Sequence, residues 1–404
     1  MITWKRNLYI CWIGSFFTVA GMNLVIPFLP LFIKQLGLHG YEEIEIWSSL
    51  AFCSTFITAA IFSPIWGKLA DKHGVKPMLI RASLGMAVVV TLMGFVQNVF
   101  QLVALRFLMG IVSGFLAAAI ILVATQTPSN MSGRALGILS TGGVAGTLIG
   151  PVFGGLLADF IGFRQVFWVT GIFLVLTFII VLFIKEEKKD LAKTKEKAKA
   201  ADLEKNPFFW KIALRIFVLT FVLQAALMSI QPILTLYVSD IAGKTSFIAF
   251  LAGIVTAVSG ISNMIAAPYL GKLSDQLGPQ KVLQFSLIAV AIMLAMHAFV
   301  GSVWQLIVLR FLLGFGLGGL IPAINTYLKK IVPQSLTGKI FGYNQTAQYI
   351  GNVAGPLAGG LIASKLGIPY VFIISCCLLL FNALWLLLFR RRMNKQQHTT
   401  HLEG

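Results

Sequence analysis

Three charged residues stand where their charge either costs energy or can join two segments of the fold. Asp71 separates two long apolar stretches, and a carboxylate at such a turn can cap the positive amino end of a helix. Arg106 and Arg310 lie inside apolar stretches, where an arginine is expensive to bury and should face a watery or protein-lined interior. The alternatives for both are hydrogen bonds to helix carbonyls, or a side chain that extends outward to the polar boundary.

Groups that would support other chemistry are not clustered in the sequence. An intramembrane enzyme would need paired acids, a His/Asp/Glu metal set or a serine with a base, and no such set is recognisable. The four cysteines lie in apolar stretches without a Cys-x-x-Cys spacing, which is typical of small buried residues. No phosphate-binding loop of the G-x-x-x-x-G-K type occurs. We therefore predict no enzyme activity, no metal and no cofactor, and we expect a gradient to supply any energy.

The elements that position these residues must be membrane-spanning, because the composition is that of a membrane protein. Of the 404 residues, 57% are hydrophobic and only 11% are charged, with a mean hydropathy of +0.86. A water-soluble chain of this size could not bury so much apolar surface. Soluble enzymes, DNA-binding domains and secreted disulfide scaffolds are therefore excluded. The net charge of +18 then reflects orientation in a membrane rather than binding to nucleic acid.

Apolar stretches of about 20 residues, long enough to cross a bilayer, predict twelve helices. Alternating β-barrel patterning is absent, so helices are the structure that satisfies the backbone in lipid. The predicted spans cover residues 8–33, 45–67, 77–97, 101–126, 135–158, 165–185, 210–238, 246–271, 281–301, 304–328, 340–363 and 369–390.

The basic residues predict the orientation of these spans. Most of the 32 lie before the first span, in the even-numbered gaps or after the last span, so both termini are expected in the cytoplasm. The first span is expected to be retained rather than cleaved as a signal peptide. We predict an N-terminal six-helix bundle (1–184), a cytoplasmic linker (185–209), a C-terminal six-helix bundle (210–392) and a polar tail (393–404).

The two halves share short motifs at a nearly constant offset of 204 or 205 residues. The repeated segments are 67–71 with 271–275, 106–110 with 310–314, and 150–155 with 355–360. Parallel halves related by an axis along the membrane normal are typical of transporters that bind their substrate near the midplane, between the halves.

With these motifs the sequence resembles the major facilitator superfamily, and within it the twelve-span drug–proton antiporters of bacteria. Residues 67–77 are close to that family's G-x-L-A-D-x-x-G-x-K pattern. The resemblance covers nearly the whole chain. It implies an all-α integral membrane protein with two pseudo-twofold-related six-helix bundles.

The resemblance implies a gating role for the segment that contains Gly67, Asp71, Gly74 and Lys76. We expect this segment to form a loop between spans 2 and 3, where Gly74 supplies the freedom in φ that a reversal requires. In the family, Asp71 would cap the amino end of span 11 and hold the inner gate shut. The alternative is an ordinary turn with solvated charges. The resemblance also assigns Arg106 to proton coupling, while Arg310 is expected to be structural.

Span 5 matches the antiporter signature G-x-x-x-G-P-x-x-G-G, a pattern that the resemblance links to export by exchange. Its glycines at steps of four residues make a smooth face against which another helix can pack closely, and its proline bends the span. The motif residues are Gly146, Gly150, Pro151, Gly154 and Gly155.

Polar and soft side chains near the predicted midplane are candidates for substrate binding. Prolines in spans 1 and 7 free backbone carbonyls near the midplane, which makes the amides beside them candidates. The alternative is interhelical hydrogen bonding for the amides, and contact with lipid or neighbouring helices for the others. The candidates are Asn23, Phe56, Met109, Gln224, Met228, Gln231 and Gln348.

No acid falls in the middle of a predicted span. Many members of the wider antiporter family carry a mid-membrane acid that binds both the proton and a cationic drug. Without one, Asp71 and Asp159 remain as coupling candidates, with His297 a third that is more easily explained as a packed residue. The pocket should accordingly favour neutral or zwitterionic aromatic molecules over permanent cations.

The resemblance implies a monomeric secondary transporter of the bacterial cytoplasmic membrane. It would export diverse hydrophobic or amphiphilic compounds in exchange for protons by alternating access, with the solute, protons and the lipid bilayer as its partners. A sugar or metabolite carrier, or a lipid flippase, on the same fold is the alternative. A non-transporting membrane receptor or an intramembrane enzyme is a more remote one.

Overall fold

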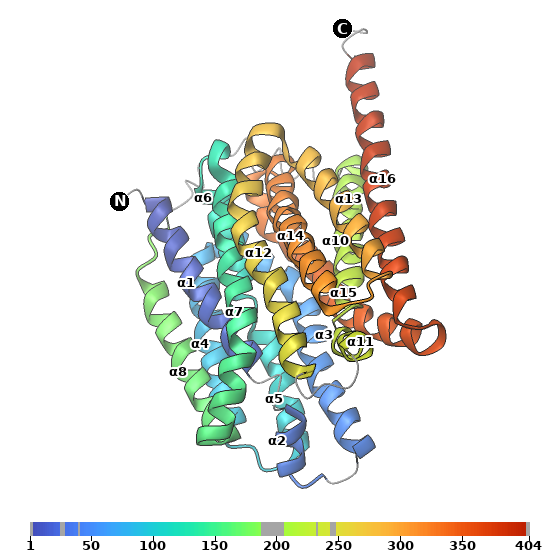
Figure 1. Ribbon diagram of the computed structural model, residues 1–404. Helices are drawn as coiled ribbons and strands as arrows, with labels where there is room; N and C mark the ends of the chain where they lie inside the picture. The colour runs from blue at the N-terminus through green and yellow to red at the C-terminus, as the bar shows by residue number, and fades with distance from the viewer. Residues whose placement is uncertain are drawn as a thin grey trace.

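The computed structural model describes residues 3–24, 29–38, 41–186, 206–231, 233–242 and 248–400, and their regular elements are helices. Both chain ends lie at one end of the helix bundle (Figure 1). We call this end the termini face and the opposite end the far face. The predicted linker lies almost entirely outside the described residues, as do Pro27 and Pro232 of the predicted breaks.

The helices divide into two halves with the same order of long elements. The N-terminal half contains α1 (Thr3–Leu24), α2 (Leu29–Gln35), α3 (Tyr41–His73), α4 (Val75–Met93), α5 (Val99–Val112), α6 (Phe115–Gln126), the 3-10 turn η1 (Ser129–Met131), α7 (Ser132–Ile161) and α8 (Phe163–Leu182). The C-terminal half contains α10 (Pro207–Met228), α11 (Leu234–Ala242), α12 (Ile248–Leu277), α13 (Pro279–His297), α14 (Val303–Ile331), η2 (Gln334–Leu336), α15 (Thr337–Leu366) and α16 (Ile368–Thr400).

All twelve predicted spans fall on helices, which confirms the all-α fold class. Among the described residues, nine helical segments are long and apolar enough to cross a membrane. The other three predicted spans correspond to α1, α7 and α15.

The repeat seen in the sequence also sets where the helices begin and end. Gly74 and Gly278 have φ of 93° and 91°, and each makes the turn between two antiparallel helices. Asn98 and Ser302 cap α5 and α14, where each side chain accepts a hydrogen bond from the backbone amide three residues later. Each pair is 204 residues apart, so the halves reuse the same local signals.

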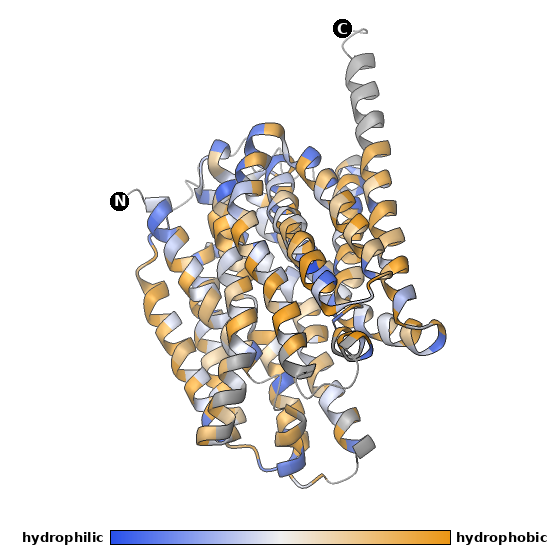
Figure 2. Ribbon diagram, viewed as in Figure 1, coloured by the Kyte–Doolittle hydropathy of each residue, from blue (hydrophilic) through white to orange (hydrophobic). Residues whose placement is uncertain are grey.

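Apolar side chains cover the outside of the bundle, and polar residues gather at its ends (Figure 2). On α4, Leu84, Val88 and Leu92 are 44%, 52% and 47% exposed, whereas Met86 and Val90 are buried. An exposed apolar stripe at four-residue spacing suits a helix that faces lipid on one side and the core on the other.

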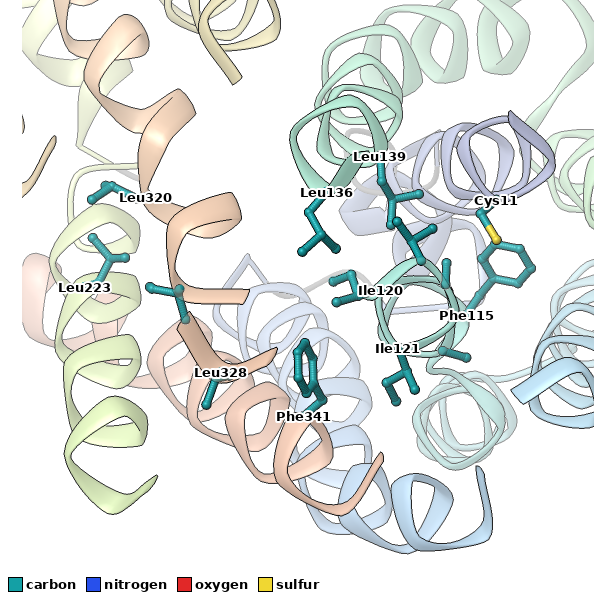
Figure 3. Packing of buried hydrophobic residues seen from close by; sticks show 14 of the residues in the cluster. Cys11, Phe115, Ile120, Ile121, Leu136, Leu139, Leu223, Leu320, Leu328 and Phe341 are labelled. Carbon is teal, nitrogen blue, oxygen red and sulfur yellow. The ribbon is translucent and has the colours of Figure 1, made fainter. Parts of the chain in front are cut away.

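Buried apolar side chains also join the two halves. Phe341 of α15 points toward Ile120 and Ile121 of α6 (Figure 3), and all three side chains are buried. The hydrophobic core is therefore continuous between the halves in this conformation.

Two predicted boundaries are wrong. The α3 helix continues to His73, so the segment 67–73 is helical and only Gly74 makes the turn that we expected to be a longer loop. Span 4 is not continuous, because α5 ends at Val112 and α6 begins at Phe115. Gly114 between them has φ of 112°, in the left-handed region that favours glycine.

Candidate functional site

Asp71, in the last turn of α3, caps the first turn of α15 in the other half. Its Oδ1 accepts a hydrogen bond from the Gly338 amide at 2.7 Å, and its Oδ2 accepts one from the Lys339 amide at 2.8 Å. The first amides of a helix lack partners within the helix and carry partial positive charge, which favours a carboxylate at this position. The contact that the resemblance implied for Asp71 is thus present.

Asp275 makes the equivalent contact with the halves exchanged. It lies near the end of α12, and its two carboxylate oxygens accept hydrogen bonds from the amides of Gly133 (2.7 Å) and Arg134 (3.0 Å) at the start of α7. This contact of Asp275 was not predicted, although the repeat of residues 67–71 at 271–275 carries the necessary signal. We call the two contacts the paired caps.

Glycines allow the helices beneath the paired caps to touch through their backbones. A Cβ atom on Gly67 would overlap the Gly338 carbonyl, and one on Gly133 would overlap the Gly271 carbonyl. One turn further along α15, a Cβ on Gly342 would lie 2.8 Å from the Ser63 carbonyl oxygen. The two crossings, α3 with α15 and α7 with α12, form what we call the glycine seam.

Other contacts between the two halves lie at the termini face or further toward the middle of the bundle. Lys329 donates a hydrogen bond to the Thr127 carbonyl at the termini face (2.7 Å). On α15, Thr346 donates one to the Ala60 carbonyl (2.7 Å). The contacts between the halves extend as far as Phe56 of α3, whose ring centroid lies 6.1 Å from that of Tyr349 of α15. At a rise of about 1.5 Å per residue, this contact is roughly 25 Å from the end of α3.

Lys76 does not act across the halves. Its Nζ donates to the Leu182 carbonyl at the end of α8 (2.7 Å). In return, Glu186 accepts hydrogen bonds from the Val75 amide (2.8 Å) and the Lys76 amide (2.7 Å) at the start of α4. This reciprocal pair holds α4 to α8 within the N-terminal half.

Replacing Glu186 with glutamine should therefore lower stability without changing the contacts between the halves. The amide keeps one acceptor oxygen but loses the charge that the first turn of α4 favours, at a cost of about 1 kcal/mol. We expect a lower midpoint of thermal unfolding, measured on the purified protein, and an unchanged distance between the halves. Glu43→Gln, at an exposed position in α3, is the matched control. An unchanged unfolding midpoint in Glu186→Gln would contradict the assignment.

The two intramembrane arginines are buried, with 8% exposure for Arg106 and 7% for Arg310. Neither side chain extends to the surface. In both, Nε and Nη2 are buried with no hydrogen-bond partner among the described residues. Asp159 lies in α7, but its side chain is outside the described residues. The proton-coupling role of Arg106 and Asp159 therefore stays a prediction.

His297 is packed inside the C-terminal half. The residue is fully buried, its Nδ1 lies 2.6 Å from the Met293 carbonyl oxygen, and its ring centroid is 5.5 Å from that of Phe372. This environment favours the interpretation of His297 as a packed residue.

The antiporter motif of span 5 packs α7 against α1 of the same half. Cβ atoms on Gly146 and Gly150 would lie 2.7 Å from backbone atoms of α1, and one on Gly154 would overlap the Leu24 carbonyl. Pro151 lies inside α7, and the surroundings of Gly155 are outside the described residues. The smooth helical face expected from the sequence is therefore used within a half, and different glycines of α7 form the seam.

Three of the predicted substrate-binding residues are engaged inside their own halves. Gln224 donates to Asn352 Oδ1 (2.7 Å), and Asn23 donates to the Val19 carbonyl (2.8 Å). Met109 is 2% exposed within the hydrophobic core, so it offers no surface to a solute in this conformation.

The other four candidates are scattered. Phe56 lies at the seam, and Met228 packs beside Gly355 of α15. Gln348 accepts a hydrogen bond from Gln345 (3.3 Å), and Gln231 is exposed just beyond α10. The structure therefore does not gather the seven predicted residues into one pocket.

Comparisons with known proteins agree with this architecture. The family model described as Major Facilitator Superfamily matches residues 11–262 and 234–403. Multidrug resistance protein MdtG of Citrobacter koseri is 47% identical, over 97% of this chain and 97% of its own length. MdtG of Serratia proteamaculans is 45% identical, over 100% of this chain and 98% of its own length.

Among solved structures, the crystal structure of the human organic anion transporter MFSD10 (TETRAN) matches 96% of this chain and 100% of its own with a TM-score of 0.81. At 14% sequence identity this likeness concerns the fold alone. The family match and the close relatives extend over nearly the whole chain. The chain therefore belongs to the Major Facilitator Superfamily.

Proposed function

We propose that the protein is a secondary transporter of the bacterial inner membrane that exports hydrophobic or amphiphilic compounds in exchange for protons. The relatives that share 45% to 47% of its residues are named multidrug resistance proteins, which supports drug-like solutes as cargo. The apolar composition and the nine described helical segments that can span a bilayer support the membrane location.

The paired caps are the main observation that supports alternating access. Each cap joins one half to the other, so both caps must break when the halves separate at the termini face. The excess of basic residues in the loops on this side supports a cytoplasmic location for it. In this assignment the described conformation is closed toward the cytoplasm, and Asp71, together with Gly67 and Gly74, belongs to the inner gate.

Close packing within each half supports movement of the halves as two bodies. The motif glycines hold α7 against α1, and Gly351, Gly355 and Gly359 hold α15 against α10 in the same way. Interiors packed this closely transmit displacement rather than absorb it. The contacts that must change during transport are then those between the halves.

Cells that express the protein should extrude a hydrophobic fluorescent dye faster than cells without it, and the extrusion should stop when the pH gradient is collapsed. Exchange for protons supplies the physical reason, because the solute is then driven by that gradient. Dye efflux with and without a protonophore measures both points. Retention that does not change on expression would contradict export and favour a metabolite carrier or a flippase. Extrusion that survives the protonophore would contradict proton exchange alone.

A further inference from the structure

Two threonines of α3 hold the backbone of α5 at Arg106. The hydroxyl of Thr55 donates a hydrogen bond to the Arg106 carbonyl (3.0 Å), and the hydroxyl of Thr58, on the same face of α3, lies 3.0 Å from the Phe107 carbonyl oxygen. The Thr58 hydroxyl also lies 2.8 Å from the Ser54 carbonyl oxygen of its own helix, so its single proton is shared between two acceptors. Both threonines are buried. We call these contacts between α3 and α5 the threonine tether.

Glycine lets the two helices of the tether approach each other closely. Gly110 lies one turn after Arg106 in α5. A Cβ atom on Gly110 would overlap the Thr58 hydroxyl and the Thr55 carbonyl. Hydrogen bonds and close backbone packing therefore both fix the position of Arg106 along α3.

The equivalent crossing in the C-terminal half, α12 with α14, keeps the glycine but not the tether. A Cβ atom on Gly314 would overlap the Ser259 carbonyl. The residues 204 positions after the two threonines are Ser259 and Ser262. Ser259 donates to the Thr256 carbonyl of its own helix (2.9 Å), and the Ser262 hydroxyl is buried with no partner among the described residues. Because this crossing packs without a tether, the tether in the N-terminal half indicates a purpose other than packing.

The guanidinium of Arg106 is poorly paired in the conformation that is closed at the termini face. Its Nε and Nη2 are buried and have no hydrogen-bond partner within the described part of the chain. An unpaired donor on a buried charged group raises the free energy of the conformation that contains it. Any conformation in which the guanidinium gains an acceptor is therefore favoured relative to this one.

The helix that carries the tether also carries contacts with the other half. Phe56, next to Thr55, contacts the Tyr349 ring of α15, and Asp71 caps α15 at the end of the same helix. The helix α3 is continuous between these contacts, although Pro64 lies inside it. A displacement of α5 at Arg106 would therefore move α3 where α3 meets α15.

We propose that Thr55 and Thr58 are positioning residues that link the buried charge of Arg106 to the inner gate. Because the tether holds the Arg106 backbone, the guanidinium cannot shift along α3 toward an acceptor without moving α3 itself. The free-energy cost of the unpaired donors is then relieved when α3 separates from α15, so Arg106 favours opening of the gate. The inference deepens the proposed function, and it rests on that function for the assignment of the gate.

The rate at which a water-soluble maleimide modifies Ile120→Cys measures opening of the gate. Ile120 of α6 is buried opposite Phe341 of the other half (Figure 3), so a cysteine at this position should react when the halves separate. The native cysteines are replaced first, and the full chain is held in nanodiscs. The rate follows the population of the open conformation even when that population is small.

Thr55→Val removes the donor and keeps the shape of the side chain, and Arg106→Gln removes the charge. The two substitutions are also combined, and Thr55→Ser restores the donor. Thr170→Val is the matched control, because Thr170 is a buried threonine of α8 whose hydroxyl donates to the Val166 carbonyl of its own helix (2.8 Å).

We expect modification to become about fivefold slower in Thr55→Val and in Arg106→Gln, the factor that one hydrogen bond of ordinary strength contributes. In the combined variant, Thr55→Val should add no further change, because the two residues act through one contact. Thr55→Ser and Thr170→Val should react like the wild type. A purely structural role for Thr55 predicts the opposite sign, because a loosened N-terminal half would react faster.

An unchanged or faster reaction in Thr55→Val would overturn the proposal, and this variant decides the matter if Arg106→Gln fails to fold. Additive effects in the combined variant would also overturn it, since Thr55 would then act independently of Arg106. Dye efflux from cells is scored separately. Absence of export with slower modification in Thr55→Val would contradict the proposed function and leave the link between Arg106 and the gate intact.

Discussion

Replacing Gly67 with valine should reduce export at least tenfold, the largest effect that we expect from a single substitution. A side chain at this position overlaps the Gly338 carbonyl, and its nearest neighbours are backbone atoms of α15 that cannot rotate away. Overpacking of this kind costs about 1 to 3 kcal/mol, and about 1.4 kcal/mol changes a population tenfold. The cost falls only on the conformation closed at the termini face, so the cycle should stall with this side open.

Gly360→Val is the matched control for this prediction. Gly360 lies in α15, and a Cβ atom there meets nothing within 4 Å. Dye efflux from cells at equal expression measures the effect, and thermal unfolding checks that the variant folds. Wild-type efflux in Gly67→Val would show that the backbone contact at the glycine seam is not needed for transport.

Changing both Asp71 and Asp275 to asparagine should shift the protein toward a conformation open at the termini face by about a hundredfold. A hydrogen bond to a charged group contributes about 1.5 to 3 kcal/mol, and each asparagine loses the charge and one of the two acceptors. We expect a shift of about tenfold for each single variant. The two caps bind the amino ends of different helices, α7 and α15, so their effects should add.

Distances between spin labels at His73 of α3 and Lys330 of α14 measure this shift, since both residues are exposed on the termini face. The four native cysteines are replaced before labelling. Asp240→Asn, at an exposed position in α11, changes the same charge away from the caps and should leave the distances as in the wild type. An unchanged distance distribution in the double variant would show that the paired caps do not hold the gate.

The helices and one of the two caps follow from the sequence because their signals are local or repeated. About 20 apolar residues define each span, and the resemblance to the superfamily gave the helix that Asp71 caps. The same reasoning applied to the repeat would have found Asp275. The helical conformation of residues 67–73 was missed because a charged, glycine-containing segment reads as a turn, although α3 continues through it to make the cap.

The break in span 4 could not be predicted from glycine alone. Gly114 takes a positive φ, whereas Gly318 at the equivalent position is helical. The difference lies in donors from other helices, Trp66 and Arg81, which only the assembled fold brings to the carbonyls. The scatter of the predicted pocket residues has a similar origin. An amide in an apolar helix, such as Gln224, shows that a partner exists but not on which side of the helix it lies.

The contacts of the glycine seam are made by backbone atoms, so they do not depend on the side chains that would bind cargo. At the two crossings of the seam the helices meet through carbonyls, amides and α-carbons, and each of the paired caps adds one aspartate. Residues that contact cargo can therefore be substituted without changing the glycine seam. Bacteria selected for resistance to a new compound should keep glycine at positions 67, 133, 271 and 338.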